Sequence, residues 1–138
     1  MAERAFKIHA LGEVAIRCHD RAAMERFYGE VIGLEIMSRR DMGITFFHIA
    51  EGVAGHTSVL ALFEDAEAPV TGERSSLHHL ALSLPWAEQE SAIGWYEEIG
   101  QPYRIQDFPW IGWRGVFTED PEGNTVELVA AVPGGPEA

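Results

Sequence analysis

The sequence repeats itself with an offset of 66 residues, and this repeat constrains the fold more than any other feature. The offset places Glu13, in the run GEVAIRC, on His79, in the run HHLALSL. It also places Ala61 on Glu127, inside the run NTVELVA. The apolar alternation in these runs is typical of strands. An imidazole and two carboxylates at corresponding points of a duplicated motif predict a metal site at the junction of the copies.

The first copy has the order β-α-β-β-β. A strand over residues 12–18 precedes Asp20, a predicted helix N-cap, and the following helix is predicted to end at Gly33. Met24, Phe27, Tyr28 and Val31 fall on one face of that helix. The runs LEIMSRR, ITFFHIA and TSVLALF are then predicted to be strands.

The second copy repeats that order. The strand LHHLALSL is followed by a helix, WAEQESAIGWYEEIG, which is predicted to end at Gly100. Three further strands are predicted in PYRIQDF, WRGVFTE and NTVELVA, with DPEGN as the hairpin turn between the last two. The predicted organisation is a first module at 1–64, a linker at 65–76, a second module at 77–132 and a disordered tail at 133–138.

Composition narrows the class of protein and its partners. A chain of 138 residues with 46% hydrophobic residues can form one domain or two small fused modules. The net charge of −12 disfavours nucleic acid and anionic membranes as partners. The single cysteine, Cys18, excludes an internal disulfide and suits a reducing compartment. Together with the lack of a long apolar run or a signal-peptide core, these features predict a cytoplasmic location.

Three stretches resemble the vicinal oxygen chelate superfamily, which includes glyoxalase I, fosfomycin-resistance enzymes, bleomycin-binding proteins and extradiol dioxygenases. They are VAIRCHDRAAMERFYGEVIGLE, HHLALSL and DPEGNTVELV, and FYGEVIGLE and DPEGNTVEL are their most specific parts. The resemblance implies an α+β fold in which two βαβββ modules form a curled, cup-shaped mixed sheet. Any metal would lie inside that cup.

The resemblance also implies a ligand set. In the superfamily the ligands come from the first and last strands of each module, which correspond here to Glu13, Ala61, His79 and Glu127. Because Ala61 has no donor atom, Glu13, His79 and Glu127 remain as catalytic and metal-binding residues. One imidazole and two carboxylates favour an octahedral divalent ion such as Mn²⁺ or Fe²⁺ over a structural Zn²⁺ site, with Ni, Co and Zn left open. The alternative is a solvated Glu13 and a His79 that merely hydrogen-bonds in the core.

Strand alternation makes this geometry testable, because residues two apart share a face. The predicted cup-facing sets are Glu13, Ala15 and Arg17 in the first strand, Leu77, His79, Ala81 and Ser83 in the fifth, and Thr125, Glu127 and Val129 in the last. By the same rule His78 faces away from the cup. The apolar residues between these positions are predicted to pack under the helices.

Five further residues are candidates for the substrate pocket. Arg17 could meet an anionic substrate or form a surface ion pair, and His48 could be an acid–base group or an ordinary half-buried histidine. Trp110 and Trp113 suggest an aromatic wall for a ring-bearing substrate, or else pack against another module or subunit. Phe117 stands where extradiol dioxygenases carry a tyrosine, ten residues before the last ligand. Its missing hydroxyl counts against catechol ring cleavage.

Two functions of different classes fit these features. The first is a divalent-metal-dependent lyase, isomerase or dioxygenase-like enzyme that acts on a small oxygen-chelating substrate through Lewis-acid activation. The second is a metal-free, bleomycin-resistance-like protein that sequesters its ligand. Because an exposed sheet edge on so small a module is a liability, a homodimer that covers it is expected in either case.

Overall fold

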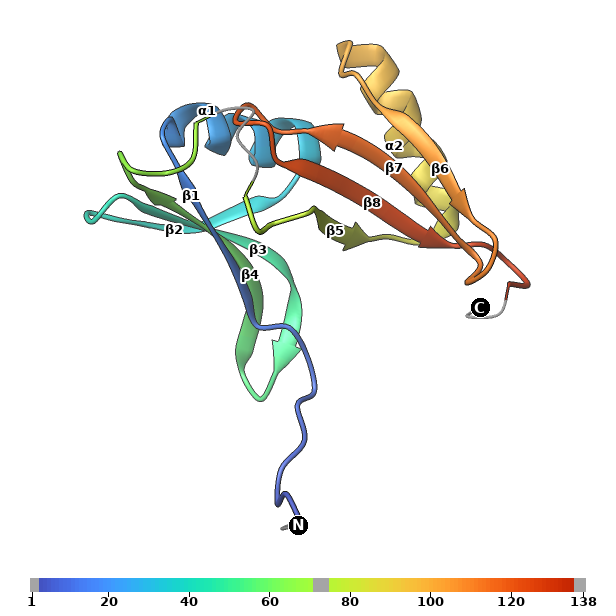
Figure 1. The fold of residues 1–138 in the computed structure, drawn as a ribbon, viewed down its shortest axis with the longest axis horizontal. Helices are drawn as coiled ribbons and strands as arrows, with labels where there is room; N and C mark the ends of the chain where they lie inside the picture. Colours follow the sequence, from blue (N-terminus) through green and yellow to red (C-terminus); the bar gives the residue numbers. More distant parts are fainter. Residues whose placement is uncertain (1–2, 71–74, 136–138) are drawn as a thin grey trace. The chain divides into compact units, whose positions relative to one another are not determined.

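The structure, a computed structural model, describes residues 3–70 and 75–135. The chain divides into two compact units, Met1–Ala68 and Pro69–Ala138, and the division falls inside the predicted linker at 65–76. Each unit holds one four-stranded sheet (Figure 1). Of the predicted tail, residues 136–138 lie outside the described residues, and the backbone NH of Gly135 donates to the carbonyl oxygen of Val132 at 3.0 Å in a turn.

The first unit has the element order β-α-β-β-β that its sequence predicts. Its elements are β1 (Glu13–Cys18), α1 (Arg21–Arg26), η1 (Phe27–Ile32), β2 (Glu35–Arg40), β3 (Ile44–Val53) and β4 (His56–Glu64). The strands lie in the order β1-β4-β3-β2, with β1 parallel to β4 and the other neighbours antiparallel. The helix therefore serves as the crossover that a parallel pair of strands needs.

The second unit has the same order and the same strand directions. Its elements are β5 (Leu80–Ser83), α2 (Trp86–Ile99), β6 (Arg104–Phe108), β7 (Trp113–Glu119) and β8 (Thr125–Ala131). The strands lie in the order β5-β8-β7-β6, with β5 parallel to β8. Two βαβββ units make the fold α+β, as the sequence predicts; the curling of both sheets into one cup stays a prediction.

The strand register of the two sheets follows the 66-residue repeat of the sequence. Ala15 of β1 pairs with Ala61 of β4, and Ala81 of β5 pairs with Glu127 of β8. Each member of the second pair is 66 residues beyond its counterpart in the first. The two units therefore share sequence order, topology and register.

The first helix begins where the sequence predicts and ends differently. The Asp20 carboxylate accepts a hydrogen bond from the backbone NH of Ala23 at 3.0 Å, which caps α1. After Arg26 the chain continues as the π-helix η1, and it stops at Gly33 with φ of 94°. The wider turn lets the adjacent residues Phe27 and Tyr28 both be buried, with ring centroids 5.0 Å apart.

The core of each unit lies between its sheet and its helix. In the first unit Leu60, Leu62 and Phe47 are fully buried with Met24 and Tyr28. In the second unit Val116 and Val126 are fully buried with Gln89 and Tyr96. These sheet residues alternate with the polar-bearing positions, so the apolar faces pack under the helices as predicted. No helix among the described residues is long and apolar enough to cross a membrane.

Hydrogen bonds as well as apolar packing hold α2 on its sheet. The Gln89 amide nitrogen donates to the carbonyl oxygens of Arg114 at 2.7 Å and Leu128 at 3.0 Å. The Arg114 guanidinium donates to the Gln89 side-chain oxygen and lies 3.9 Å from the centroid of the Trp86 ring. This buried amide fixes the position of the helix along β7 and β8.

The DPEGN turn that joins β7 to β8 is built around Asp120, which is 5% exposed. Its carboxylate accepts hydrogen bonds from the backbone NH groups of Glu122 and Asn124 at 2.9 and 3.0 Å, and from the Asn124 side chain at 2.8 Å. Gly123, with φ of 86°, supplies the left-handed residue that the turn needs. The turn therefore sets the register of the strand that carries Glu127.

Asp120→Ala should destabilise the protein, because it leaves these donors without their charged acceptor. We expect the free energy of unfolding to fall by about 2 kcal/mol in urea denaturation. The matched control is Asp41→Ala at an exposed turn between β2 and β3, which should change stability by no more than about 0.5 kcal/mol. Equal stabilities for the two variants would contradict this account of the turn.

Candidate functional site

The polar residues that the repeat singles out in the second unit meet at one point. Glu127 lies in the middle of β8 and is 5% exposed, while His79 directly precedes β5 and its side chain is one-third exposed. Nε2 of His79 lies 3.1 Å from Oε1 of Glu127. An imidazole nitrogen and a carboxylate oxygen, both common metal ligands, are therefore adjacent within this unit.

Burial dominates the electrostatics of this pair. Loss of hydration raises the pKa of the Glu127 carboxyl above its usual range, and the neighbouring His79 and Arg104 lower it by less. An ionised carboxylate at this position is thus incompletely compensated by the protein alone. Additional positive charge beside it would be stabilising.

Because Gly115 has no side chain, it leaves the space that the Glu127 carboxylate occupies. A Cβ atom at residue 115 would lie 2.2 Å from Oε2 of Glu127 and 2.7 Å from the Phe117 ring. No side-chain-bearing residue fits there unless the carboxylate or the ring moves. The glycine thus lets a carboxylate and an aromatic ring lie close together on one face of the sheet.

Phe117 and Arg104 extend this face across two more strands. Glu127 of β8 pairs with Phe117 of β7, which pairs with Arg104 of β6. The Phe117 ring lies 5.9 Å from the His79 ring, and the Arg104 guanidinium lies 4.2 Å from the centroid of the Phe117 ring. A histidine, a carboxylate, an aromatic ring and a cation therefore form one continuous row, which we call the site row.

Aromatic residues flank the site row toward the β6–β7 turn. Phe108 and Trp113 are paired across β6 and β7, and the Phe108 ring lies 6.3 Å from Phe117 and 6.4 Å from Trp110. Trp110 lies in the turn and is 76% exposed, and Trp113 is 38% exposed. Both indoles therefore have exposed surface that can contact a ligand or a partner, which are the two alternatives that the sequence suggests.

The remaining predicted site residues lie in the first unit. Glu13 of β1 pairs with Val59 of β4, which pairs with His48 of β3, so Glu13 and His48 face the same side of their sheet. Arg17 shares that side and forms an ion pair with Asp65 at 3.4 Å. Since Glu13 belongs to one unit and the His79–Glu127 pair to the other, convergence of the three stays a prediction.

The fourth repeat position, Ala61, is fully buried on the same side of the first sheet. It lies between Ala15 of β1 and Phe46 of β3. In the first unit a buried alanine between a small and an aromatic neighbour therefore stands where the second unit has Glu127.

The sequence prediction differs from the structure around His78. The predicted strand starts at Leu77, but β5 starts at Leu80, so the strand alternation does not reach either histidine. His78 does not turn away from His79: their Nδ1 atoms lie 2.8 Å apart and their ring centroids 5.0 Å apart. Both residues precede the strand, and their rings meet edge to face.

Within the described ranges, no three or more His, Cys, Asp or Glu side chains gather in a metal-binding geometry. The pair in the second unit nevertheless fits a divalent ion by its chemistry. It combines one nitrogen and one oxygen donor, and its carboxylate is buried and undercompensated.

The chain matches the family of glyoxalase-like domains over residues 13–129. It belongs to the glyoxalase-like domain family. The match runs from the first residue of β1 almost to the end of β8, so it includes all four repeat positions. Comparison with curated protein sequences finds no match.

Solved structures show the same fold. A lactoylglutathione lyase from Agrobacterium tumefaciens is 25% identical, with a TM-score of 0.65 over 88% of this chain and 92% of that one. A glyoxalase/dioxygenase from Nostoc punctiforme is 20% identical, with a TM-score of 0.69 over 95% and 97%. A genomically encoded fosfomycin resistance protein from Listeria monocytogenes is 16% identical, with a TM-score of 0.67 over 92% and 97%.

Three residues of this glyoxalase-like site were not predicted from the sequence: Arg104, Phe108 and Gly115. Alternation within PYRIQDF would have placed Arg104 and Phe108 on one side of a strand. Which side faced Glu127 required the register of β6 on β7, and no repeat position marks it. Gly115, flanked by Arg114 and Val116 within a strand, was the one available signal of a close approach.

Glu127→Gln should stabilise the metal-free protein at neutral pH. A carboxyl whose pKa is raised in the folded state opposes folding when it is ionised, above its unfolded pKa near 4.5. The gain in free energy of unfolding should therefore be present at pH 7, shrink as the pH falls through the raised pKa of the folded state, and be absent below about 4.5. Urea denaturation of chelator-treated protein at pH 7 and pH 4 measures it; a less stable variant at pH 7 would contradict the assigned pKa direction.

Proposed function

We propose that this chain is a divalent-metal-dependent enzyme of the glyoxalase type that acts on a small oxygen-chelating substrate. The observation that carries the proposal is the contact between Nε2 of His79 and Oε1 of Glu127, at the positions the repeat predicts as ligands. Family membership supports the reaction class, and the buried, undercompensated carboxylate supports the need for a cation.

The proposed ligand set is His79 and Glu127 from the second unit and Glu13 from the first. Glu13 is exposed at the start of β1 and faces the side of its sheet that carries Ala15 and Ala61. These three donors would hold an octahedral ion and leave positions for two substrate oxygens. A divalent ion bound there would supply Lewis-acid polarisation of a substrate carbonyl or hydroxyl, which favours an enolate or alkoxide.

The other residues of the site row shape the reaction. Phe117 is 7% exposed and lies beside His79, so it excludes water from one side of the pair. It has no hydroxyl to orient substrate or transfer a proton. Isomerisation or addition to an electrophile fits this environment better than cleavage of a catechol ring.

A metal-free ligand-binding protein is the second candidate. The observation that favours it is the exposed indole surface of Trp110 and Trp113 on the same unit, together with an alanine at the fourth repeat position. Such a protein would bind an aromatic ligand by stacking and would not need His79. Metal analysis therefore separates the two candidates.

His79→Ala and Glu127→Ala should abolish binding of Mn²⁺ and leave the fold intact, because both side chains lie on the sheet face opposite the helix. Elemental analysis of protein purified without chelator, followed by isothermal titration with Mn²⁺, measures the loss. His56→Ala, at an exposed histidine of β4, is the matched control and should bind like the wild type. If purified His79→Ala protein still contained metal, the metal-dependent enzyme would be rejected and the metal-free binding protein preferred.

A second arm of the same titration uses Ala61→Glu, which supplies the missing fourth donor. Mn²⁺ affinity should rise, while stability without metal should fall because a carboxylate replaces a fully buried methyl group. Affinity that is unchanged would show that residue 61 does not face the ion.

A further inference from the structure

Arg104 occupies the outer end of the site row, at the edge of the second sheet. It opens β6, and its register through Phe117 to Glu127 places all three on one face. Neighbouring strands lie about 4.8 Å apart, so the Cα atoms of Arg104 and Glu127 are separated by about 10 Å. That distance suits the two ends of one small molecule.

The Arg104 side chain is held in place, and its charge acts on the Glu127 carboxyl from beyond ion-pair distance. Its guanidinium lies over the Phe117 ring, and Nη1 donates to Oε1 of Gln106 at 2.8 Å. Across residues 3–70 and 75–135, no carboxylate lies within ion-pair distance of it. By contrast, Arg17, Arg39 and Arg114 are ion-paired with Asp65, Glu25 and Glu90.

What distinguishes Arg104 from the other arginines is its place at the end of the site row, over the Phe117 ring. A guanidinium has five NH donors in a fixed planar arrangement, and the Gln106 contact uses only one nitrogen. The aromatic ring beneath it keeps the plane in place without consuming the donors. The remaining donors are available to a ligand.

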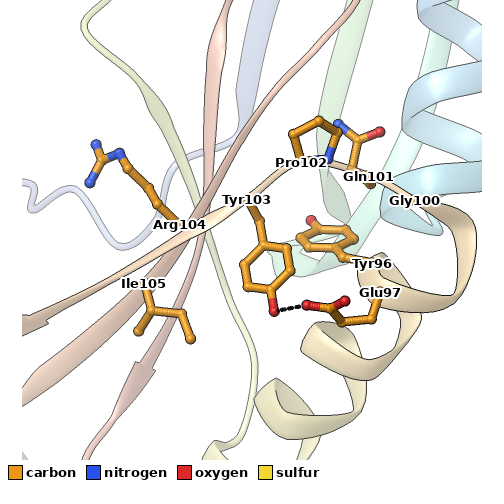
Figure 2. A pocket seen from close by; sticks show the side chains of 8 residues that line it. All are labelled: Tyr96, Glu97, Gly100, Gln101, Pro102, Tyr103, Arg104 and Ile105. Carbon is orange, nitrogen blue, oxygen red and sulfur yellow. Dashed lines mark hydrogen bonds between the residues drawn. The ribbon is translucent and has the colours of Figure 1, made fainter.

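The surroundings of Arg104 differ on the two sides of β6. Figure 2 shows Tyr103 turned toward α2, where its hydroxyl donates to Glu97, and Arg104 extending away from that contact. A cavity of about 520 Å³ at this end of the sheet has Arg104, Phe117 and Thr125 in its lining, together with Tyr103 and Thr118. Thr125 precedes Glu127 by two residues, so the two share one face of β8.

Two acidic residues, Glu119 and Asp120, also line this cavity. The Asp120 carboxylate is occupied by the three hydrogen bonds of the DPEGN turn. Glu119, at the end of β7, is exposed and paired with Thr125. Neither forms an ion pair with Arg104, so the positive charge remains available.

We propose that Arg104 binds a carboxylate group of the substrate, and that the site row therefore selects anionic substrates. The planar guanidinium matches a carboxylate through two parallel hydrogen bonds. The inference deepens the proposed function by naming the substrate class, but carboxylate binding at Arg104 does not itself require a metal ion. Arg17 is less suited to this role because Asp65 already neutralises it.

The test compares benzoate with its neutral counterpart benzamide on chelator-treated protein by isothermal titration. Wild-type protein should bind benzoate more tightly than benzamide. Arg104→Gln should lose that preference, with benzoate affinity reduced about tenfold or more. Arg104→Lys should retain part of it, because an ammonium keeps the charge without the planar pair of donors.

Arg26→Gln is the matched control, since it removes one exposed arginine charge from α1 and should leave benzoate affinity unchanged. Equal affinity of the wild type for benzoate and benzamide, or an Arg104→Gln variant with wild-type preference, would overturn the proposal. Because the protein is metal-depleted, this outcome is separate from the Mn²⁺ titrations of His79→Ala and Glu127→Ala. Carboxylate binding without metal binding would keep this inference and reject the proposed enzyme.

Discussion

The parallel pairing of the first and last strand in each unit is the interaction on which the rest of the structure depends. Because β1 pairs with β4 and β5 with β8, residues from opposite ends of each unit are neighbours. A parallel pair requires a crossover, which the helices provide, and the helices then cover one face of each sheet. The uncovered face can carry polar chemistry without disturbing the core.

The two units use one register in different ways. At the first unit's pairing of Ala15 with Ala61, the Ala61 methyl group is fully buried and Ala15 is exposed. At the second unit's pairing of Ala81 with Glu127, a carboxylate is buried instead. Burying this carboxylate costs hydration free energy, and its interactions with His79 and Arg104 offset only part of that cost. The second unit thus contains the His79–Glu127 contact, whereas Glu13 lies in the first unit.

Sequence patterns predicted the elements well because their signals are local. The glycines that end the helices, Gly33 and Gly100, both adopt positive φ, and the DPEGN turn forms between the predicted strands. The 66-residue offset predicted that both units repeat one order of elements, and the strand register follows the same offset. It also marked His79 and Glu127, which the structure brings into contact.

The parts that the sequence did not predict depend on packing between elements. The π-helical end of the first helix leaves no periodic signal in six residues. β5 starts at Leu80, opposite Val126 of β8, whereas the apolar character of Leu77 predicted an earlier start. The side of β6 that faces the site depends on its register with β7, so Arg104 remained one charged residue among many until the strands were paired.

Gly115 carries no functional group, yet the shape of the site depends on its lack of a side chain. Because a Cβ atom at residue 115 would meet the Glu127 carboxylate and the Phe117 ring, alanine or a β-branched residue is expected there only in variants that have also changed Glu127 or Phe117. Variants that keep both of these side chains should retain glycine. Residue 115 would therefore record in an evolving population whether selection has acted on the fold alone or on the chemistry it supports.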